Sequence, residues 1–262
     1  MLSRLFGKTS SPPYLAASEY WVFIDEPRAP KQDDVMERMI QGSPYARSGP
    51  APIGPREGLL WSDIRFHMAL VLREKNAHAF RPDLFGPHIE LSSEHLSALA
   101  ESKALVKLSY ISEQTLPDNR HLQFLVYAAE SVAALSGARV IFDHVAERLM
   151  LSPELQKSLE ENSDGARKEL HLHTVWRTCP AGGTAETRGL RKIGFPELVT
   201  PETMNEHRCL AKQILELAAD RIWDERTLPP RMVVDHLGDR FHVVTEFARK
   251  GPCRSTILRE NA

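Results

Sequence analysis

Two histidines separated by one residue are the clearest candidates for metal chemistry in this chain. His171 and His173 lie in a stretch, residues 169–177, whose alternation predicts a β-strand, and residues two apart on a strand share one face. Two imidazoles on one face can hold a zinc ion, but zinc needs three or four ligands, and none with ligand spacing is nearby. We therefore expect two histidines on the solvated face of an edge strand and no metal, with a metal site as the alternative.

A second pattern could support acid and base chemistry. Asp143 and Asp235 each end a predicted strand, and each is followed by a histidine. Such pairs can transfer protons, although aspartate is also common at strand ends because its side chain turns the chain. The sequence holds no glycine-rich phosphate loop, nucleophile elbow, His-Glu-x-x-His or kinase signature. The motifs therefore predict no catalytic residue and no cofactor.

A charged segment at residues 186–198 is the first candidate for binding. Gly189 and Gly194 allow turns or a close backbone approach, and basic side chains beside them can bind a carboxylate or phosphate. The residues expected to bind are Arg188, Arg191, Lys192 and Glu197. The simpler interpretation is that the glycines and Pro196 shape a crossover from a hairpin to the next helix.

Part of this segment resembles a known family. The pattern Thr-x-Gly-Leu-x-Lys-x-Gly-x-Pro-Glu-Leu at residues 187–198 is similar to a segment of an uncharacterised bacterial domain-of-unknown-function family, and the likeness extends over residues 100–250. The resemblance implies a bacterial cytosolic protein. It brings no assigned catalytic residue, so no site can be carried over from it.

A second binding candidate is the long stretch of residues 42–58. Its four prolines and four glycines disfavour a helix or a central strand, so we expect a loop. Long loops in compact domains are usually either disordered or functional. The residues of this loop that could contact a partner are Tyr45, Arg47 and Arg56.

Composition excludes several classes of protein. A hydrophobic content of 42% over 262 residues can bury a core, so the chain is not disordered as a whole. The 33 basic and 35 acidic residues nearly balance, which disfavours nucleic acid and anionic membrane as partners. The three cysteines form no Cys-x-x-Cys pattern, and we expect free thiols in the cytoplasm. No apolar run is long enough for a signal peptide or a membrane span.

The elements expected to position these residues begin with a buried helix over residues 118–136. Gly137 is expected to end it in a left-handed conformation, before a central strand at 139–143. Further strands are expected at residues 19–25, at 64–73 with one face in the core, and at 104–111. Ser92 or Ser93 is expected to begin the helix before the last of these.

The rest of the chain predicts hairpins and one more helix. We expect hairpins at residues 169–188 and 231–247, a helix from Thr200 to Trp223, and a basic tail from Arg249. The fold class is α+β, with a mixed or largely antiparallel sheet and helices packed on it. Residues 1–13 are expected to be a flexible tail, and 14–262 one domain or two packed halves that divide near 160–169.

These observations favour binding over catalysis. We expect a non-catalytic bacterial cytosolic protein that binds another protein, as an inhibitor, immunity protein or adaptor, with a toxin or effector as its partner. The alternative is a hydrolase that uses a metal at His171 and His173, or the Asp and His pairs at strand ends.

Overall fold

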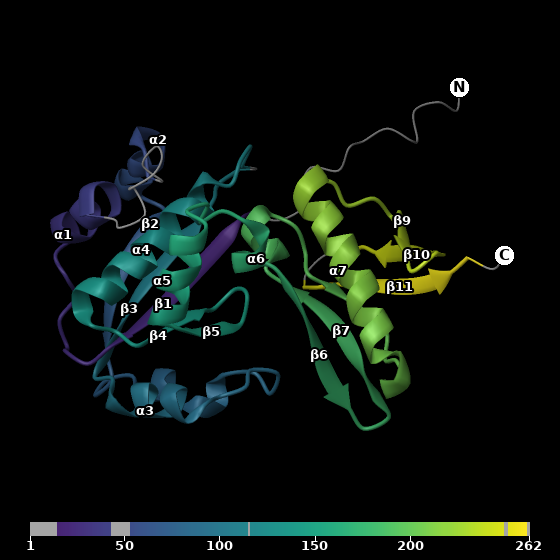
Figure 1. Cartoon of the computed structure of the whole chain (residues 1–262), viewed down its shortest axis with the longest axis horizontal. Helices are drawn as coiled ribbons and strands as arrows, with labels where there is room; N and C mark the ends of the chain where they lie inside the picture. The colour runs from purple at the N-terminus through teal and green to yellow at the C-terminus, as the bar shows by residue number, and fades with distance from the viewer. Residues whose placement is uncertain (1–14, 43–52, 115, 249–250, 261–262) are drawn as a thin grey trace. The chain divides into compact units, whose positions relative to one another are not determined.

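The computed structural model describes residues 15–42, 53–114, 116–248 and 251–260, in which the chain forms two compact units. Of these described residues, the first unit contains those within 17–112 and 116–171, and the second contains those from 172 onward together with 15–16 and 113–114. The chain passes from the first unit to the second after His171. Helices and two largely antiparallel sheets confirm the α+β fold class (Figure 1).

The first unit is built on a five-stranded antiparallel sheet with the strand order β2-β3-β1-β4-β5. Its strands are β1 (Ala17–Ile24), β2 (Phe66–Leu72), β3 (Ala104–Ile111), β4 (Val140–Asp143) and β5 (Arg148–Leu151). β3 has the predicted bounds, and β4 has a strand on each side, as its apolar faces require. Ile141 faces one layer of the core, and Val140 and Phe142 face the other.

Helix α4 (Arg120–Ser136) packs on one face of this sheet and is largely buried, as predicted (Figure 1). It ends at Gly137, whose φ of 62° is the expected left-handed conformation. Beside α4 lie α1 (Gln32–Glu37), α2 (Pro55–Gly58) and α5 (Ser152–Glu161).

Helix α3 (Ser93–Glu101) contributes Ala98 and Leu99 to the core layer that contains Val140 and Phe142. Ser92 caps it, because its hydroxyl accepts a hydrogen bond of 3.2 Å from the amide of His95. The sequence therefore located this helix start correctly.

Two expectations for the first unit are corrected. β2 lies at the edge of the sheet, with Ile64 just before it and 83% exposed, so the stretch 64–73 contributes less to the core than its alternation suggested. Residues expected to begin a strand at 169 instead form the short helix α6 (Lys168–His171), which buries both Leu170 and His171. A strand would have placed those two side chains on opposite faces.

The second unit has a six-stranded sheet with the order β6-β7-β8-β11-β10-β9, antiparallel except where β8 pairs with β11. Its strands are β6 (His173–Cys179), β7 (Gly182–Arg188), β8 (Leu198–Val199), β9 (Arg231–His236), β10 (Asp239–Glu246) and β11 (Cys253–Arg259). Helix α7 (Arg208–Glu225) packs on β6, β7, β9 and β10 (Figure 1). Both predicted hairpins, β6 with β7 and β9 with β10, are confirmed.

Two expectations for the second unit are also corrected. Thr200 does not begin the long helix, because its hydroxyl accepts a hydrogen bond of 2.9 Å from the amide of Ala185 in β7. Residues 201–204 form no helix, a 3₁₀ turn follows at Asn205–His207, and α7 starts only at Arg208. The segment expected to be a basic tail contains β11, whose alternating Cys253 and Ser255 are buried.

Candidate functional site

The two histidines proposed as metal ligands belong to different elements. His171 ends α6 and is fully buried, whereas His173 begins β6 and is half-buried. The Nε2 of His171 lies 2.7 Å from the carbonyl oxygen of Gly165, and its Nδ1 lies 3.2 Å from the Tyr20 hydroxyl. The imidazole of His171 is therefore engaged on both sides inside the first unit, which corrects its expected place on a solvated strand.

His171 continues into a buried polar chain with Tyr20 and Asp143. The Gly165 carbonyl can only accept, so Nε2 of His171 must donate to it. The Tyr20 hydroxyl hydrogen bonds both to Asp143 and to Nδ1 of His171. The Tyr20 hydroxyl therefore joins the carboxyl group of Asp143 to the imidazole of His171.

The surroundings of these three side chains determine the pKa of Tyr20. Burial raises the pKa of Tyr20 well above its usual value, and the charge of Asp143 raises it further. The Oδ1 atom of Asp143 also accepts from the amide of Ala146 at 3.0 Å. His144, in contrast, stacks on Trp21 with the ring centroids 4.9 Å apart. The side chains of Asp143 and His144 thus contact different residues.

The second Asp and His pair lies at the end of β9. The carboxylate of Asp235 accepts from Nε of Arg240 at 3.1 Å on the exposed surface. Within the described ranges, no group of three or more His, Cys, Asp or Glu residues has the geometry of a metal site.

The charged segment at residues 186–198 folds around its own glutamate. Glu197 is buried, and its Oε1 accepts from the amides of Gly189 at 2.9 Å and Arg191 at 3.2 Å. Its Oε2 accepts from the hydroxyl of Thr187 at 2.8 Å and the amide of Leu190 at 3.3 Å. Gly189 makes this possible with a φ of 113°, a conformation that favours glycine. Burial raises the pKa of Glu197, although these donors oppose that shift.

The basic residues of this segment lie mostly inside the second unit. Arg188 is largely buried and donates to Glu186 at 2.5 Å, Lys192 is fully buried, and Arg191 is exposed. Burial raises the pKa of Glu186, but the charges of Arg188 and Arg177 with their hydrogen bonds bring it below its usual value. The carboxylate that the segment surrounds is that of its own Glu197. This arrangement agrees with the simpler interpretation, in which the glycines shape a crossover.

Only part of the proposed binding loop is described. Tyr45 and Arg47 lie outside the described residues, and Arg56 lies exposed in α2. Ile53 is buried in the core beside α4, and residues 55–58 are helical. The expectation that residues 42–58 form only a loop is therefore corrected for its last four residues, and for Gly42, which ends a π-helical turn at Arg38–Gly42.

A more accessible feature is the free side of β2, which pairs with β3 alone among the described strands. The amide of Arg73 donates to Lys103 at 2.9 Å, and the register then pairs His67, Ala69 and Val71 with β3 through hydrogen bonds. In an antiparallel ladder the intervening residues direct their backbone groups to the opposite side. The amides and carbonyls of Met68 and Leu70 therefore face outward. We call this side, from Phe66 to Leu72, the β2 edge.

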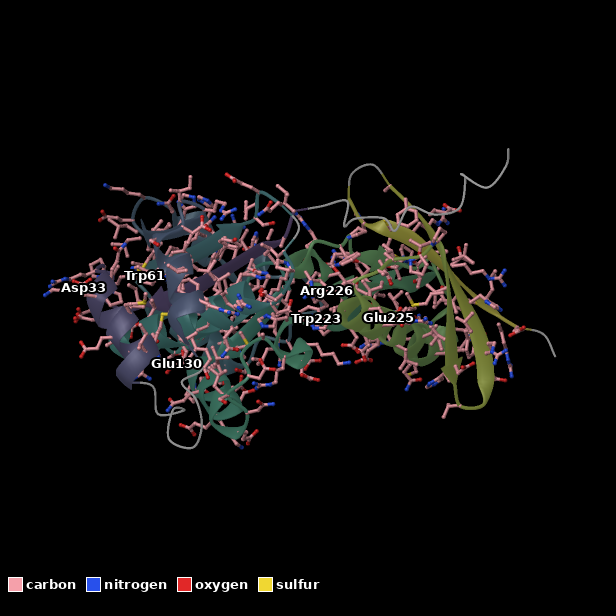
Figure 2. The ribbon with its side chains drawn as sticks, turned by 90° about the horizontal axis from the view of Figure 1, so that it is seen from above. Asp33, Trp61, Glu130, Trp223, Glu225 and Arg226 are labelled. Carbon is pink, nitrogen blue, oxygen red and sulfur yellow. The ribbon has the colours of Figure 1, made fainter. Side chains whose placement is uncertain are left out.

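Apolar side chains accompany the β2 edge. Leu59 is 70% exposed, Ile64 is 83% exposed, and Leu70 is 39% exposed on the strand itself. Trp61, which is labelled in Figure 2, packs against Phe66 with ring centroids 5.4 Å apart and so connects the preceding turn to β2. Exposed apolar side chains beside unpaired backbone groups are the features that an added strand requires.

Two arginines flank the β2 edge. Residues 64–73 contain two arginines and one histidine and no carboxylate. Arg65 pairs with the neighbouring Asp63, while Arg73 donates to the carbonyls of Leu99 and Ser102 at 2.7 and 2.8 Å. His67 is exposed. The sequence predicts the strand but not this edge, because alternation reveals a strand but not how many neighbours it has. The histidine and alanine on the second face of the strand were the available signal.

Comparison with known proteins adds no relative. No family model matches the chain, and no curated protein or solved structure matches it. In the part of the chain that the structure describes, no helix has the length and apolar character needed to cross a membrane.

Proposed function

We propose that this chain is a non-catalytic protein-binding protein whose β2 edge takes up an extended segment of its partner as an additional strand. The observation that carries the proposal is the outward direction of the Met68 and Leu70 backbone groups. Strand addition satisfies such groups and derives specificity from alternate side chains. Leu59, Ile64 and Leu70 supply the apolar contacts for that purpose.

The chemistry of the edge favours a partner segment in which apolar and acidic residues alternate. A second copy of this chain is a poorer occupant than such a segment. Antiparallel pairing that places Met68 opposite Leu70 would bring Arg65 of each copy opposite Arg73 of the other. Like charges directly opposite each other destabilise a strand pair. Acidic residues at these positions would instead be attracted, and the attraction would weaken with salt.

A role as an inhibitor, immunity protein or adaptor in the bacterial cytosol accords with this mode of binding. A protein that adds a partner's strand to its own sheet can block or recruit that partner without catalysing a reaction. A toxin or effector with an accessible extended segment is the partner class that we propose. The hydrolase alternative receives less support, because His171 is bonded at both ring nitrogens.

The test separates the backbone of residue 70 from its side chain. Leu70→Pro and Leu70→Thr both remove the apolar side chain, but only proline removes the outward amide. Capture from the native bacterium by the wild type would supply the partner for titration. We expect Leu70→Pro to weaken binding at least tenfold more than Leu70→Thr does. Hydrogen exchange at Met68 and Leu70 should slow when the partner binds.

The control for this experiment is a measurement of whether each variant still folds. Leu70→Pro should keep the wild-type circular dichroism spectrum, because its amide makes no bond to β3. Equal binding by both variants, or unchanged exchange at Met68 and Leu70 in the complex, would exclude the β2 edge. Turnover of a small molecule with no partner captured at any salt concentration would exclude the binding function altogether.

A further inference from the structure

The strand at the end of the second sheet leaves one of its sides open. Among the described strands, β9 pairs with β10 alone. The amide of Thr245 donates to the carbonyl of Pro230, just before β9, at 2.8 Å, and in this antiparallel register the even-numbered residues of β9 bond to β10. The odd-numbered residues therefore direct their amides and carbonyls away from β10. We call this side the β9 edge, and its residues are Arg231, Val233 and Asp235.

The side chains of the β9 edge are accessible as well. Met232 and Val234 are buried, so the alternation of the strand places the other three side chains on the face away from α7. All three are exposed, Val233 by 40%. Arg221 of α7 donates from its Nη1 to the carbonyl of Val233 at 3.2 Å. This carbonyl can thus be reached by a donor from outside the sheet.

The order of residues along the β9 edge is complementary to itself. If two copies pair antiparallel about Val233, Arg231 of each copy lies opposite Asp235 of the other. Opposite charges in such positions stabilise a strand pair, whereas the arginines that flank the β2 edge would repel each other. The two Val233 side chains meet between the ion pairs. All three residues then occupy hydrogen-bonded positions, which the direction of their backbone groups requires.

The residues before β9 limit this pairing to one register. Pro229 is the next residue on the open side, and it has no amide hydrogen to donate. A shift of two residues along the strand would place Val233 opposite Arg231 or Asp235 and would lose both ion pairs. The charges therefore select the arrangement that is centred on Val233.

We propose that two copies of this chain associate through the β9 edge, which joins the sheets of their second units into one antiparallel sheet. The amide of Val233 from each copy takes the place of Arg221 at the Val233 carbonyl of the other. The pairing is short and buries little surface, so the dimer is weak and reversible. The proposal concerns the second unit and does not depend on the function proposed for the β2 edge.

The test is sedimentation equilibrium of the full chain at rising concentration. In self-pairing, Arg231→Asp sets carboxylates opposite carboxylates, and Asp235→Arg sets guanidinium groups opposite each other. Each variant should raise the Kd of the dimer by about tenfold. An equimolar mixture of the two variants restores opposite charges at both positions, so it should associate as the wild type does. Added salt should weaken the wild-type dimer.

The mixture also controls for effects inside one chain. Asp235 accepts from Arg240 at 3.1 Å, and Arg231 donates to His242 at 3.1 Å, so each substitution changes a contact of its own sheet. Mixing leaves those changes in place and alters only the contacts between copies. Recovery of the dimer on mixing can therefore come only from pairing between the two variants.

A matched variant and a second measurement complete the experiment. Arg254→Asp reverses an exposed charge on β11, which has a strand on each side, and should leave the Kd unchanged. Hydrogen exchange at the amide of Val233 should slow as the protein concentration rises. A wild type that stays monomeric up to about 1 mM would overturn the proposal. So would a mixture of the two variants that associates no better than either variant alone.

Discussion

Tyr20 connects two ionisable groups in the core of the first unit. Replacing it with phenylalanine would keep the ring but leave Asp143 and the Nδ1 atom of His171 without the hydroxyl that links them. Buried groups that lose such a partner are costly. We expect Tyr20→Phe to lower the free energy of unfolding by about 2–4 kcal/mol, measured by urea denaturation.

Tyr127 provides the matched control for that measurement. It is also a buried tyrosine of the first unit, but its hydroxyl donates to a backbone carbonyl, that of Ser163, at 2.9 Å. Tyr127→Phe should cost about 1 kcal/mol, the usual contribution of one neutral hydrogen bond. Equal costs for the two variants would mean that the charged neighbours of Tyr20 contribute nothing.

The raised pKa of Tyr20 also predicts a loss of stability in alkali. In the unfolded chain tyrosine ionises near pH 10, while burial and Asp143 keep the folded hydroxyl protonated well above that. Its contribution is therefore complete below about pH 10 and is lost as the pH rises further. The stability difference between the wild type and Tyr20→Phe should shrink between pH 9 and pH 11. A constant difference over that range would contradict this.

At the scale of elements, Gly137 isolates the effect of backbone conformation. Its φ is 62°, and a Cβ atom built there would meet nothing within 4 Å. A substitution therefore costs strain and not a clash. We expect Gly137→Val to lower the free energy of unfolding by about 1–3 kcal/mol, and Gly137→Asn to cost less because asparagine tolerates this conformation. An unchanged denaturation midpoint for the valine variant would refute the strain argument.

Elements defined by local signals were predictable. The Ser92 cap, the glycine after α4 and the apolar run of β4 each act through residues next to them in the sequence. Elements defined by distant partners were not. Thr200 has the sequence context of a helix cap, but its hydroxyl instead accepts a hydrogen bond from the amide of Ala185. β11 looks like a basic tail until β8 and β10 pair with it.

The candidate sites show the same division. The sequence located the glycines of the crossover at 186–198, but not that Glu197 would occupy the space they create. It located β2 as a strand, but its exposure depends on the strand order, which no local pattern encodes.

At the scale of the whole molecule, the two units draw their strands and helices from the sequence in different ways. The sheet and helix of the second unit come entirely from residues after 171. The first unit takes its central strand β1 from its beginning and pairs it with β3 and β4, far along the chain. Its core therefore depends on contacts between distant residues.

The hydrogen bond between Tyr20 and His171 has a consequence for synthesis. Its two ends are close to the first and the last residue of the first unit. While the ribosome is still making residues before 171, β1 can pair with β3 and β4, yet Tyr20 and Asp143 lack the imidazole that completes their chain. The last side chain of the first unit to be synthesised, that of His171, is thus the one that completes these buried hydrogen bonds. A nascent chain truncated just before His171 would hold Tyr20 and Asp143 without that imidazole.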